Sequence, residues 1–292
     1  MLRRGVVAVA CEAAIFRVFP AGLVSAILRA RMDSPLPGFT ASPFTHEETT
    51  RTIFRRGEGP GVVIMTEIPG ITPQVIGFAE RVAAEGFTVF LPELFGTPGK
   101  AMTPGYALAQ IARACVSREF SALAARESSP ITAYLRALCR SVHAELGGKG
   151  VGAIGMCFTG NFALALMVDP VVMAPVLSQP SLPAPLGKER RAGLHLSDAD
   201  LAVVKQRTAA GVTVLGLRFT GDPMCPKERF AHLRAELGDG FEGIEIDSSR
   251  GNPHGIKASA HSVVTTDLVD EAGHPTRIAL DRVLAFFRER LQ

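Results

Sequence analysis

One cysteine stands where a short apolar run meets a helix-like stretch. Residues 151–160 read VGAIGMCFTG, and the segment NFALALMV follows at once. A nucleophile on a sharp turn between a strand and a helix, flanked by glycines, is held at the end of its strand in a nucleophile elbow. Because the residue here is Cys157, the pattern predicts attack of a thiolate on a carbonyl carbon.

Thiolate chemistry needs a base, because a free thiol has a pKa of about 8.5 and is mostly protonated at neutral pH. His261 is the candidate base, and Asp222 is the candidate acid that fixes its tautomer. The long loop before His261 also contains His254, and we favour His261 of the two. The chain order nucleophile, acid, base is the order of α/β-hydrolase triads.

A carboxylate and two backbone amides complete the predicted site. Glu67 ends an apolar run, where an unpaired charge is costly, and this setting favours a functional role. The oxyanion hole is predicted at the N–H of Phe158, directly after the nucleophile, and at that of Ile68, in the loop after the first buried strand.

The elements that must position these groups alternate along the chain. Strands are predicted over 49–55 (an edge strand), 61–67, 87–91, 151–156, 171–177, 212–220 and 241–247. Helices are predicted over 73–86, 105–126, 130–146, 161–168, 197–210, 228–237 and 275–291, while 33–48 and 179–195 read as irregular. The alternation predicts an α/β fold, with a mostly parallel central sheet and helices on both faces.

Composition narrows the function classes. The chain has 292 residues, 47% of them apolar, and a net charge of +3 without a basic stripe, so a nucleic-acid partner is not expected. Its five cysteines form no close pairs, which favours a reducing cytoplasm. No nucleotide-binding motif follows a strand, and Cys139 with His143 lacks a second ligand pair, so neither cofactor nor metal is predicted.

The first segment of the chain is open to more than one interpretation. Residues 1–31 are mostly apolar and resemble a signal peptide or membrane anchor in outline, but charges and a proline interrupt them. The apolar pieces are shorter than the roughly 20 residues that a membrane span needs. We therefore expect an extension over 1–48, with Met32 as an alternative start, followed by one domain over 49–292, and no membrane partner.

Five segments resemble the dienelactone hydrolase (carboxymethylenebutenolidase) family, across about residues 50–290. They are VVIMTEIPGIT, FTVFLPELFG, IGMCFTG, FTGDPMCP and AHSVV. The resemblance implies the α/β-hydrolase fold and a triad of Cys157, Asp222 and His261, with Glu67 interacting with the resting thiol. It also implies hydrolysis of an enol lactone or another ester.

The chain departs from the family pattern at two positions that matter for the site. Thr159 stands where the family has its first elbow glycine, and Thr265 stands where an arginine, four residues after the histidine, holds a substrate carboxylate. Losing that guanidinium removes an anchor of about 1.5–3 kcal/mol. Arg113 and Arg118 are the candidates to replace it.

The sequence thus predicts a hydrolase that cleaves a small-molecule ester or lactone through a thioester acyl-enzyme, as a monomer or weak homo-oligomer. Two alternatives remain, since a fold alone does not settle function. One is a non-catalytic α/β-hydrolase scaffold used for binding, with an inert Cys157. The other is a thiol redox sensor, in which Cys225 would resolve an oxidised Cys157.

Overall fold

A computed structural model describes residues 34–120, 128–182 and 187–292. The expectations for residues 1–31, including the alternative start at Met32, lie outside this part of the chain. Within the described ranges, no helix is both long enough and apolar enough to cross a membrane.

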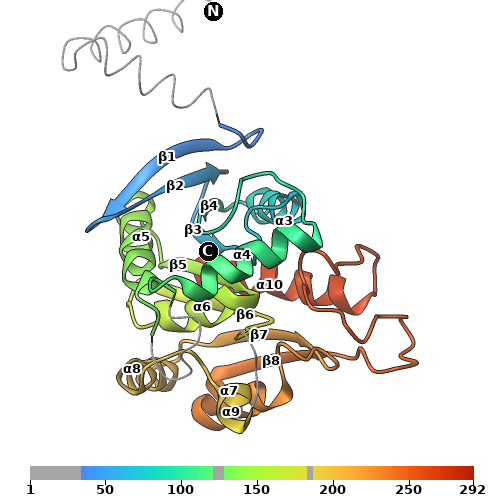
Figure 1. The fold of residues 1–292 in the computed structure, drawn as a ribbon. Helices are drawn as coiled ribbons and strands as arrows, with labels where there is room; N and C mark the ends of the chain where they lie inside the picture. Colours follow the sequence, from blue (N-terminus) through green and yellow to red (C-terminus); the bar gives the residue numbers. More distant parts are fainter. Residues whose placement is uncertain (1–33, 121–127, 183–186) are drawn as a thin grey trace, which may run out of the picture.

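The described strands form one sheet at the centre of the molecule (Figure 1). Their order is β1-β2-β4-β3-β5-β6-β7-β8, with β1, β2 and β4 paired antiparallel and β4 to β8 paired parallel. The strands are β1 Thr40–His46, β2 Thr49–Arg56, β3 Gly61–Met65, β4 Thr88–Pro92, β5 Val151–Met156, β6 Val172–Ser178, β7 Val214–Phe219 and β8 Phe241–Ile246.

Helices cover both faces of this sheet, as predicted. They are α3 Pro73–Ala84, α4 Pro104–Val116, α5 Ile131–Leu146, α6 Gly160–Leu166, α7 Gly187–Ala192, α8 Asp198–Ala209, α9 Lys227–Leu237 and α10 Pro275–Leu291. Alternate residues of a strand point to opposite faces. Val63 and Met65 of β3 therefore pack with α5 and α6, while Val62 and Ile64 pack with α3 and α10.

Two segments predicted to be irregular contain regular structure. Thr40–His46, within 33–48, forms the edge strand β1, so the strand at Thr49 lies second from the edge. Its mostly exposed Thr, Ser and Pro residues read as a loop, but an edge strand tolerates a proline such as Pro43. Gly187–Ala192, within 179–195, forms the short helix α7, whose residues are not buried.

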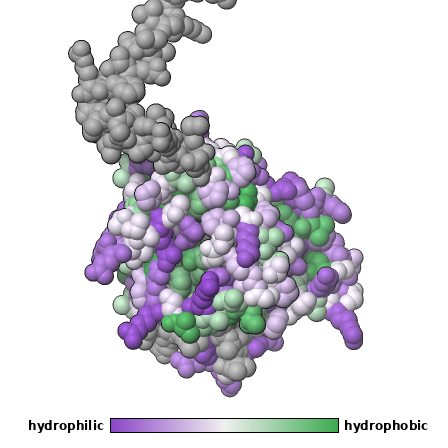
Figure 2. Space-filling view, turned by 45° about the horizontal axis from the view of Figure 1, so that its top comes forward, coloured by the Kyte–Doolittle hydropathy of each residue, from purple (hydrophilic) through white to green (hydrophobic). Residues whose placement is uncertain are grey.

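Other elements agree with the predicted ones to within a few residues, and α10 has the predicted bounds. The long helix predicted over 105–126 ends at Val116, and its last part, 121–126, lies outside the described residues. Figure 2 shows a surface in which hydrophilic residues predominate, with apolar residues exposed between them.

The parallel strands bring the predicted site residues to one edge of the sheet. Glu67 and Ile68 follow β3, Cys157 follows β5, and Asp222 follows β7. His261 comes from the long connection between β8 and α10. In an open α/β sheet, groups at the carboxyl ends of the strands line a common crevice, and this is where the functional site is expected.

Candidate active site

Cys157 occupies a strained backbone position. Its φ is +56°, in the region that favours glycine. Cys157 directly follows β5 and is the first residue of the short 3₁₀ helix Cys157–Thr159, which leads into α6. A non-glycine residue held there costs about 1–3 kcal/mol, and such residues cluster at functional sites. The elbow predicted from the sequence is therefore present.

Two glycines make this turn possible. A Cβ atom on Gly155 would lie 2.0 Å from the carbonyl oxygen of Thr159, and one on Gly160 would lie 2.6 Å from the Cα atom of Pro180. Neither distance is sterically allowed, so only glycine permits α6 to turn back this tightly onto β5 and β6.

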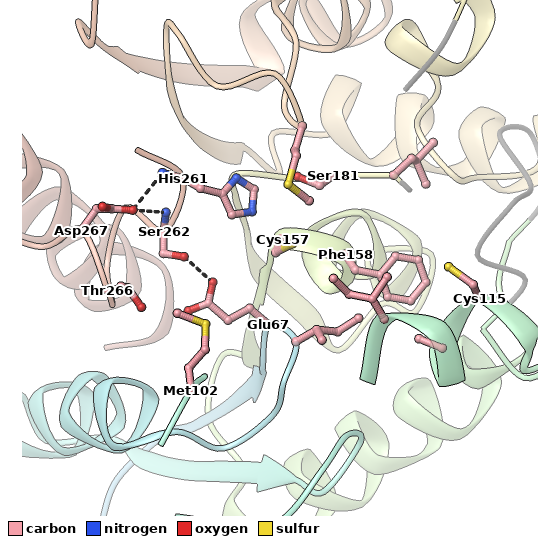
Figure 3. A pocket seen from close by; sticks show the side chains of 15 residues that line it. Glu67, Met102, Cys115, Cys157, Phe158, Ser181, His261, Ser262, Thr266 and Asp267 are labelled. Atoms are coloured by element: carbon pink, nitrogen blue, oxygen red, sulfur yellow. Dashed lines mark hydrogen bonds between the residues drawn. The ribbon is translucent and has the colours of Figure 1, made fainter. Parts of the chain in front are cut away.

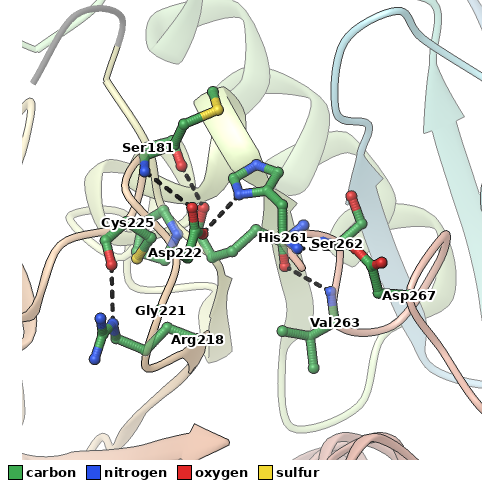
Figure 4. A network of polar contacts seen from close by, with 12 residues as sticks. Ser181, Arg218, Gly221, Asp222, Cys225, His261, Ser262, Val263 and Asp267 are labelled. Carbon is green, nitrogen blue, oxygen red and sulfur yellow. Dashed lines mark hydrogen bonds and ion pairs between the residues drawn. The ribbon is translucent and has the colours of Figure 1, made fainter. Parts of the chain in front are cut away.

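The predicted base and acid are hydrogen-bonded to each other. His261 Nδ1 lies 2.6 Å from Asp222 Oδ2 (Figure 4), and Asp222 Oδ1 accepts a bond of 2.9 Å from the amide of Met224. The buried carboxylate fixes the proton on Nδ1, which leaves Nε2 for other chemistry. Within the described chain, His261 Nε2 has no hydrogen-bond partner.

The charge of His261 reflects its neighbours. Burial of the imidazole opposes its protonation, but the negative charge of Cys157 and the hydrogen bond to Asp222 outweigh burial. The pKa of His261 therefore lies well above its usual value of about 6.5. A raised pKa favours a protonated His261 at neutral pH.

Asp267 holds the loop that carries the imidazole. Its Oδ2 accepts hydrogen bonds from the backbone amides of His261, at 2.8 Å, and Ser262, at 2.9 Å (Figure 3). By contrast, His254 lies on an exposed part of the same connection, where its ring packs edge-on against His274 with centroids 5.5 Å apart. The structure places His261, and not His254, beside Asp222.

Glu67 is bound by neutral donors that the sequence interpretation missed. Its Oε1 accepts from the Thr265 hydroxyl at 2.5 Å, and its Oε2 accepts from the Ser262 hydroxyl at 2.6 Å and from Gln179 Nε2 at 3.4 Å. Among the described residues, these are the hydrogen bonds of the Glu67 carboxylate, and none of them involves Cys157. The AHSVV motif contained Ser262 as a possible signal, whereas nothing marked Gln179.

Thr159 replaces a glycine without opening the elbow. Its buried Oγ accepts from the Met156 amide at 2.9 Å and lies 2.9 Å from the carbonyl oxygen of Met65, with that of Thr66 at 3.2 Å. The hydroxyl thus connects the turn after β5 to the end of β3. This contact lies next to the loop of Glu67 and Ile68, so it joins the nucleophile to the predicted oxyanion loop.

A cavity of about 280 Å³ brings together the predicted site residues other than Asp222. It is lined by Glu67, Ile68, Met102, Ile111, Ala114, Cys115, Cys157, Phe158, Ser181, Leu182, Met224, His261, Ser262, Thr266 and Asp267. The nucleophile, the base and both oxyanion candidates therefore share one space. The described lining contains no Lys or Arg, so neither Arg113 nor Arg118 replaces the missing arginine there.

The remaining described cysteines differ in exposure. Cys115 lines the cavity, whereas Cys139 and Cys225 are fully buried. Burial raises the pKa of both buried thiols to about 12, because a thiolate is poorly solvated there. Cys225 is therefore held as a neutral thiol, which does not favour the resolving role that a redox sensor needs.

Comparison with curated proteins gives one relative of related sequence. A carboxymethylenebutenolidase from Rhodococcus opacus is 28% identical over 129 residues. That stretch covers 44% of this chain and 44% of the relative, so the chain matches less than half of the relative's length.

Solved structures of similar fold cover most of the chain. A putative dienelactone hydrolase from Klebsiella pneumoniae matches with a TM-score of 0.55 at 16% identity, over 86% of this chain and 99% of that one. A dienelactone hydrolase-like promiscuous phosphotriesterase from metagenomic libraries matches with a TM-score of 0.56 at 18% identity, over 87% and 100%. At this level of identity the likeness concerns the fold, and it confirms the predicted fold class.

The sequence model of the Dienelactone hydrolase family matches residues 52–291, which is most of the chain and nearly all of its described core. The family predicted from the sequence is confirmed by this match: the chain belongs to the dienelactone hydrolase family.

Proposed function

We propose that the protein hydrolyses a carboxylic ester or lactone, with Cys157 as nucleophile and His261 as proton carrier. The observation that carries the proposal is the 2.6 Å contact between His261 and Asp222 at the cavity that contains Cys157. A nucleophile and an imidazole on one cavity, with an orienting carboxylate bonded to the imidazole, are the parts that acyl transfer requires.

The first half of the reaction forms a thioester. The Cys157 thiolate attacks the carbonyl carbon, and the carbonyl oxygen becomes an oxyanion near the amides of Ile68 and Phe158. When the tetrahedral adduct collapses, the bond to the leaving oxygen breaks and the His261 imidazolium gives that oxygen its proton. The alcohol departs, while the acyl group stays on sulfur.

The second half uses the now neutral imidazole. His261 Nε2 takes a proton from water, and the resulting hydroxide attacks the thioester carbonyl through the same oxyanion position. Collapse of this adduct releases the carboxylic acid and returns a thiolate beside an imidazolium. Asp222 keeps the proton on Nδ1 throughout and stabilises the charged ring.

Glu67 has a positioning role in this proposal. Its oxygens accept from Ser262 and Thr265, so the carboxylate ties the loop of His261 to the end of β3. It makes no hydrogen bond to another described group that would carry a proton to or from the substrate. We therefore assign the proton transfers to His261 alone.

Hydrolysis of p-nitrophenyl acetate and of dienelactone by the wild type and Cys157→Ala tests this function. We expect Cys157→Ala to lose turnover of every ester that the wild type cleaves, and the matched Cys139→Ala variant, at a cysteine outside the cavity lining, to keep it. Trapping of a Cys157 thioester by rapid acid quench and mass spectrometry would support the covalent step. Equal activity of the wild type and Cys157→Ala would refute the proposal.

The cellular location and the oligomeric state of the protein are part of the same proposal. A cytoplasmic location accords with the free thiols of Cys115, Cys139, Cys157 and Cys225. A monomer or weak homo-oligomer is expected in solution and can be measured by analytical ultracentrifugation. A binding scaffold remains the rival function, and it predicts no thioester at Cys157.

A further inference from the structure

The cavity has two chemically different sides, with Cys157 between them. Phe158 and Cys115 lie on one side of Cys157, and Glu67, Ser262 and Asp267 lie on the other (Figure 3). The first side is apolar, whereas the second offers carboxylate and hydroxyl oxygens, with the side chain of Met102 near its edge.

Helix α4 continues the apolar side. Ile111, Ala114 and Cys115 are spaced three and four residues apart, so they share one face of the helix, and all three line the cavity. Ala114 also belongs to the same buried cluster as Phe158. Ile111 is 38% exposed, so this side of the cavity reaches the surface at the helix.

The proposed reaction fixes which part of a substrate faces each side. The leaving oxygen must come within hydrogen-bond reach of His261, because the imidazolium protonates it. The imidazole ring lies on the side of Ser262, away from Cys115 (Figure 3). With the oxyanion directed to the amides of Ile68 and Phe158, the acyl chain is left to extend toward α4.

We infer that the enzyme prefers esters that join an apolar acyl chain to a polar, uncharged alcohol. The acyl chain would pack against α4 and Phe158, and the alcohol would lie beside Glu67, Ser262, Thr266 and Asp267. This assignment of the two sides rests on the proposed thiol mechanism.

Charge accounts for the restriction on the alcohol. Glu67 and Asp267 both carry carboxylates, and the described lining supplies no Lys or Arg. The His261 imidazolium is already paired with Asp222. A carboxylate on the alcohol would therefore lose its hydration without gaining an unpaired cation, which is unfavourable in a partly buried site. A hydroxyl group can instead donate a hydrogen bond to these oxygens.

An acyl-length series tests the apolar side. We expect kcat/KM to rise about two- to fourfold per methylene from p-nitrophenyl acetate through butyrate to hexanoate, since a buried methylene favours binding by this order. Ile111→Asp should flatten this rise. Leu108→Asp is the matched control, because Leu108 lies on the same helix, is 67% exposed and is not part of the cavity lining.

An alcohol series tests the polar side with the acyl group held constant. The butyrate esters of ethanol, ethylene glycol and 3-hydroxypropionic acid carry no charge, a hydroxyl and a carboxylate, respectively. We expect the hydroxyethyl ester to react at least as fast as the ethyl ester, and the carboxyethyl ester to react about tenfold more slowly or worse.

The outcomes separate this inference from the proposed function. Absence of Cys157-dependent turnover on every ester would overturn the function and this inference with it. Turnover that is insensitive to acyl length, or that favours the carboxyethyl ester, would overturn the inference alone. The inference would also be overturned if Ile111→Asp changed the rates of the alcohol series and not those of the acyl series. That result would mean that the alcohol, and not the acyl chain, lies against α4.

Discussion

Thr265 Oγ1 donates a hydrogen bond of 2.5 Å to Glu67 Oε1, and this bond joins the histidine loop to the end of β3. Glu67 is only 5% exposed and has no cationic partner among the described residues. A buried carboxylate without a counter-ion depends on its hydrogen-bond donors. The hydroxyls of Thr265 and Ser262 therefore stabilise the charge of Glu67 and fix the loop that carries His261.

The Thr265 hydroxyl is expected to matter for stability. Thr265→Val keeps the shape of the side chain but leaves Glu67 Oε1 without its donor, so the free energy of unfolding should fall by about 1–3 kcal/mol. Thr265→Ser keeps a hydroxyl and should lose much less. Urea unfolding monitored by circular dichroism measures both, and equal stability of the two variants would contradict this role of the bond.

The Thr159 hydroxyl is expected to support both the fold and catalysis. Thr159→Val removes the acceptor of the Met156 amide and the contact with the Met65 carbonyl, which should cost about 1–3 kcal/mol of unfolding free energy. Because Ile68 follows β3, kcat should fall while KM changes little. Thr159→Ser should restore both quantities; a variant Thr159→Val with full kcat would show that the contact is structural only.

Local signals explain why the elbow and the sheet could be predicted. Buried strands read as apolar runs, which predict β3 and β5, and the helical spacing of apolar residues over 73–86 predicts α3. The elbow followed from Gly155 and Gly160, whose roles are steric and close in sequence to Cys157. Such features depend on neighbouring residues, and the sequence displays them directly.

The features that were missed depend on contacts between distant segments. Glu67 and Thr265 are 198 residues apart, and Gln179 reaches Glu67 from a segment predicted to be irregular. Pairing between strands, and not composition, makes β1 a strand. Arg229 looks like an ordinary helix arginine, because no pattern in the sequence indicates that its side chain is fully buried.

Arg229 is expected to be among the strongest determinants of stability around the site. Its guanidinium donates to the carbonyl oxygens of Gly193 and Pro180 at 2.7 Å, Arg190 at 2.9 Å and Met224 at 3.3 Å. Burial lowers its pKa, although nearby negative groups oppose this. Arg229→Met should lose about 3 kcal/mol or more in urea unfolding, because four carbonyl groups lose a donor.

A charge-preserving variant separates the geometry of Arg229 from its charge. Arg229→Lys keeps a cation but cannot form the planar fork, so it should recover only part of the lost stability. Full recovery by lysine would mean that charge, and not the shape of the guanidinium group, stabilises these loops.

The raised pKa of His261 predicts a pH dependence. The folded protein binds this proton more tightly than the unfolded chain, so its contribution to stability is complete below about pH 6.5 and is lost as pH rises through the raised pKa. In Cys157→Ala the negative neighbour is absent while burial remains, so the pKa should fall and the loss should occur at lower pH.

Two measurements check this shift. Titration of the His261 ring proton by NMR should give a lower pKa in Cys157→Ala than in the wild type, and the urea-unfolding free energy should begin to decline at lower pH. His254→Ala serves as a control that simplifies the spectrum without touching the site. Identical titration curves for the wild type and Cys157→Ala would show that the thiol carries no charge at these pH values.

The thiols that line the cavity should react faster than the buried ones, and this difference helps to distinguish the hydrolase from the redox sensor. Cys157 lines the cavity beside an imidazolium, so iodoacetamide at neutral pH should modify it first, and peptide mass spectrometry would identify the site. Among the described cysteines of Cys157→Ala, only Cys115 should react, and more slowly. Cys139 and Cys225, buried thiols with pKa raised to about 12, should react only after unfolding.

The same burial should prevent Cys225 from resolving a peroxide-oxidised Cys157. A Cys157–Cys225 disulfide formed in the folded protein would therefore favour the redox sensor over the hydrolase.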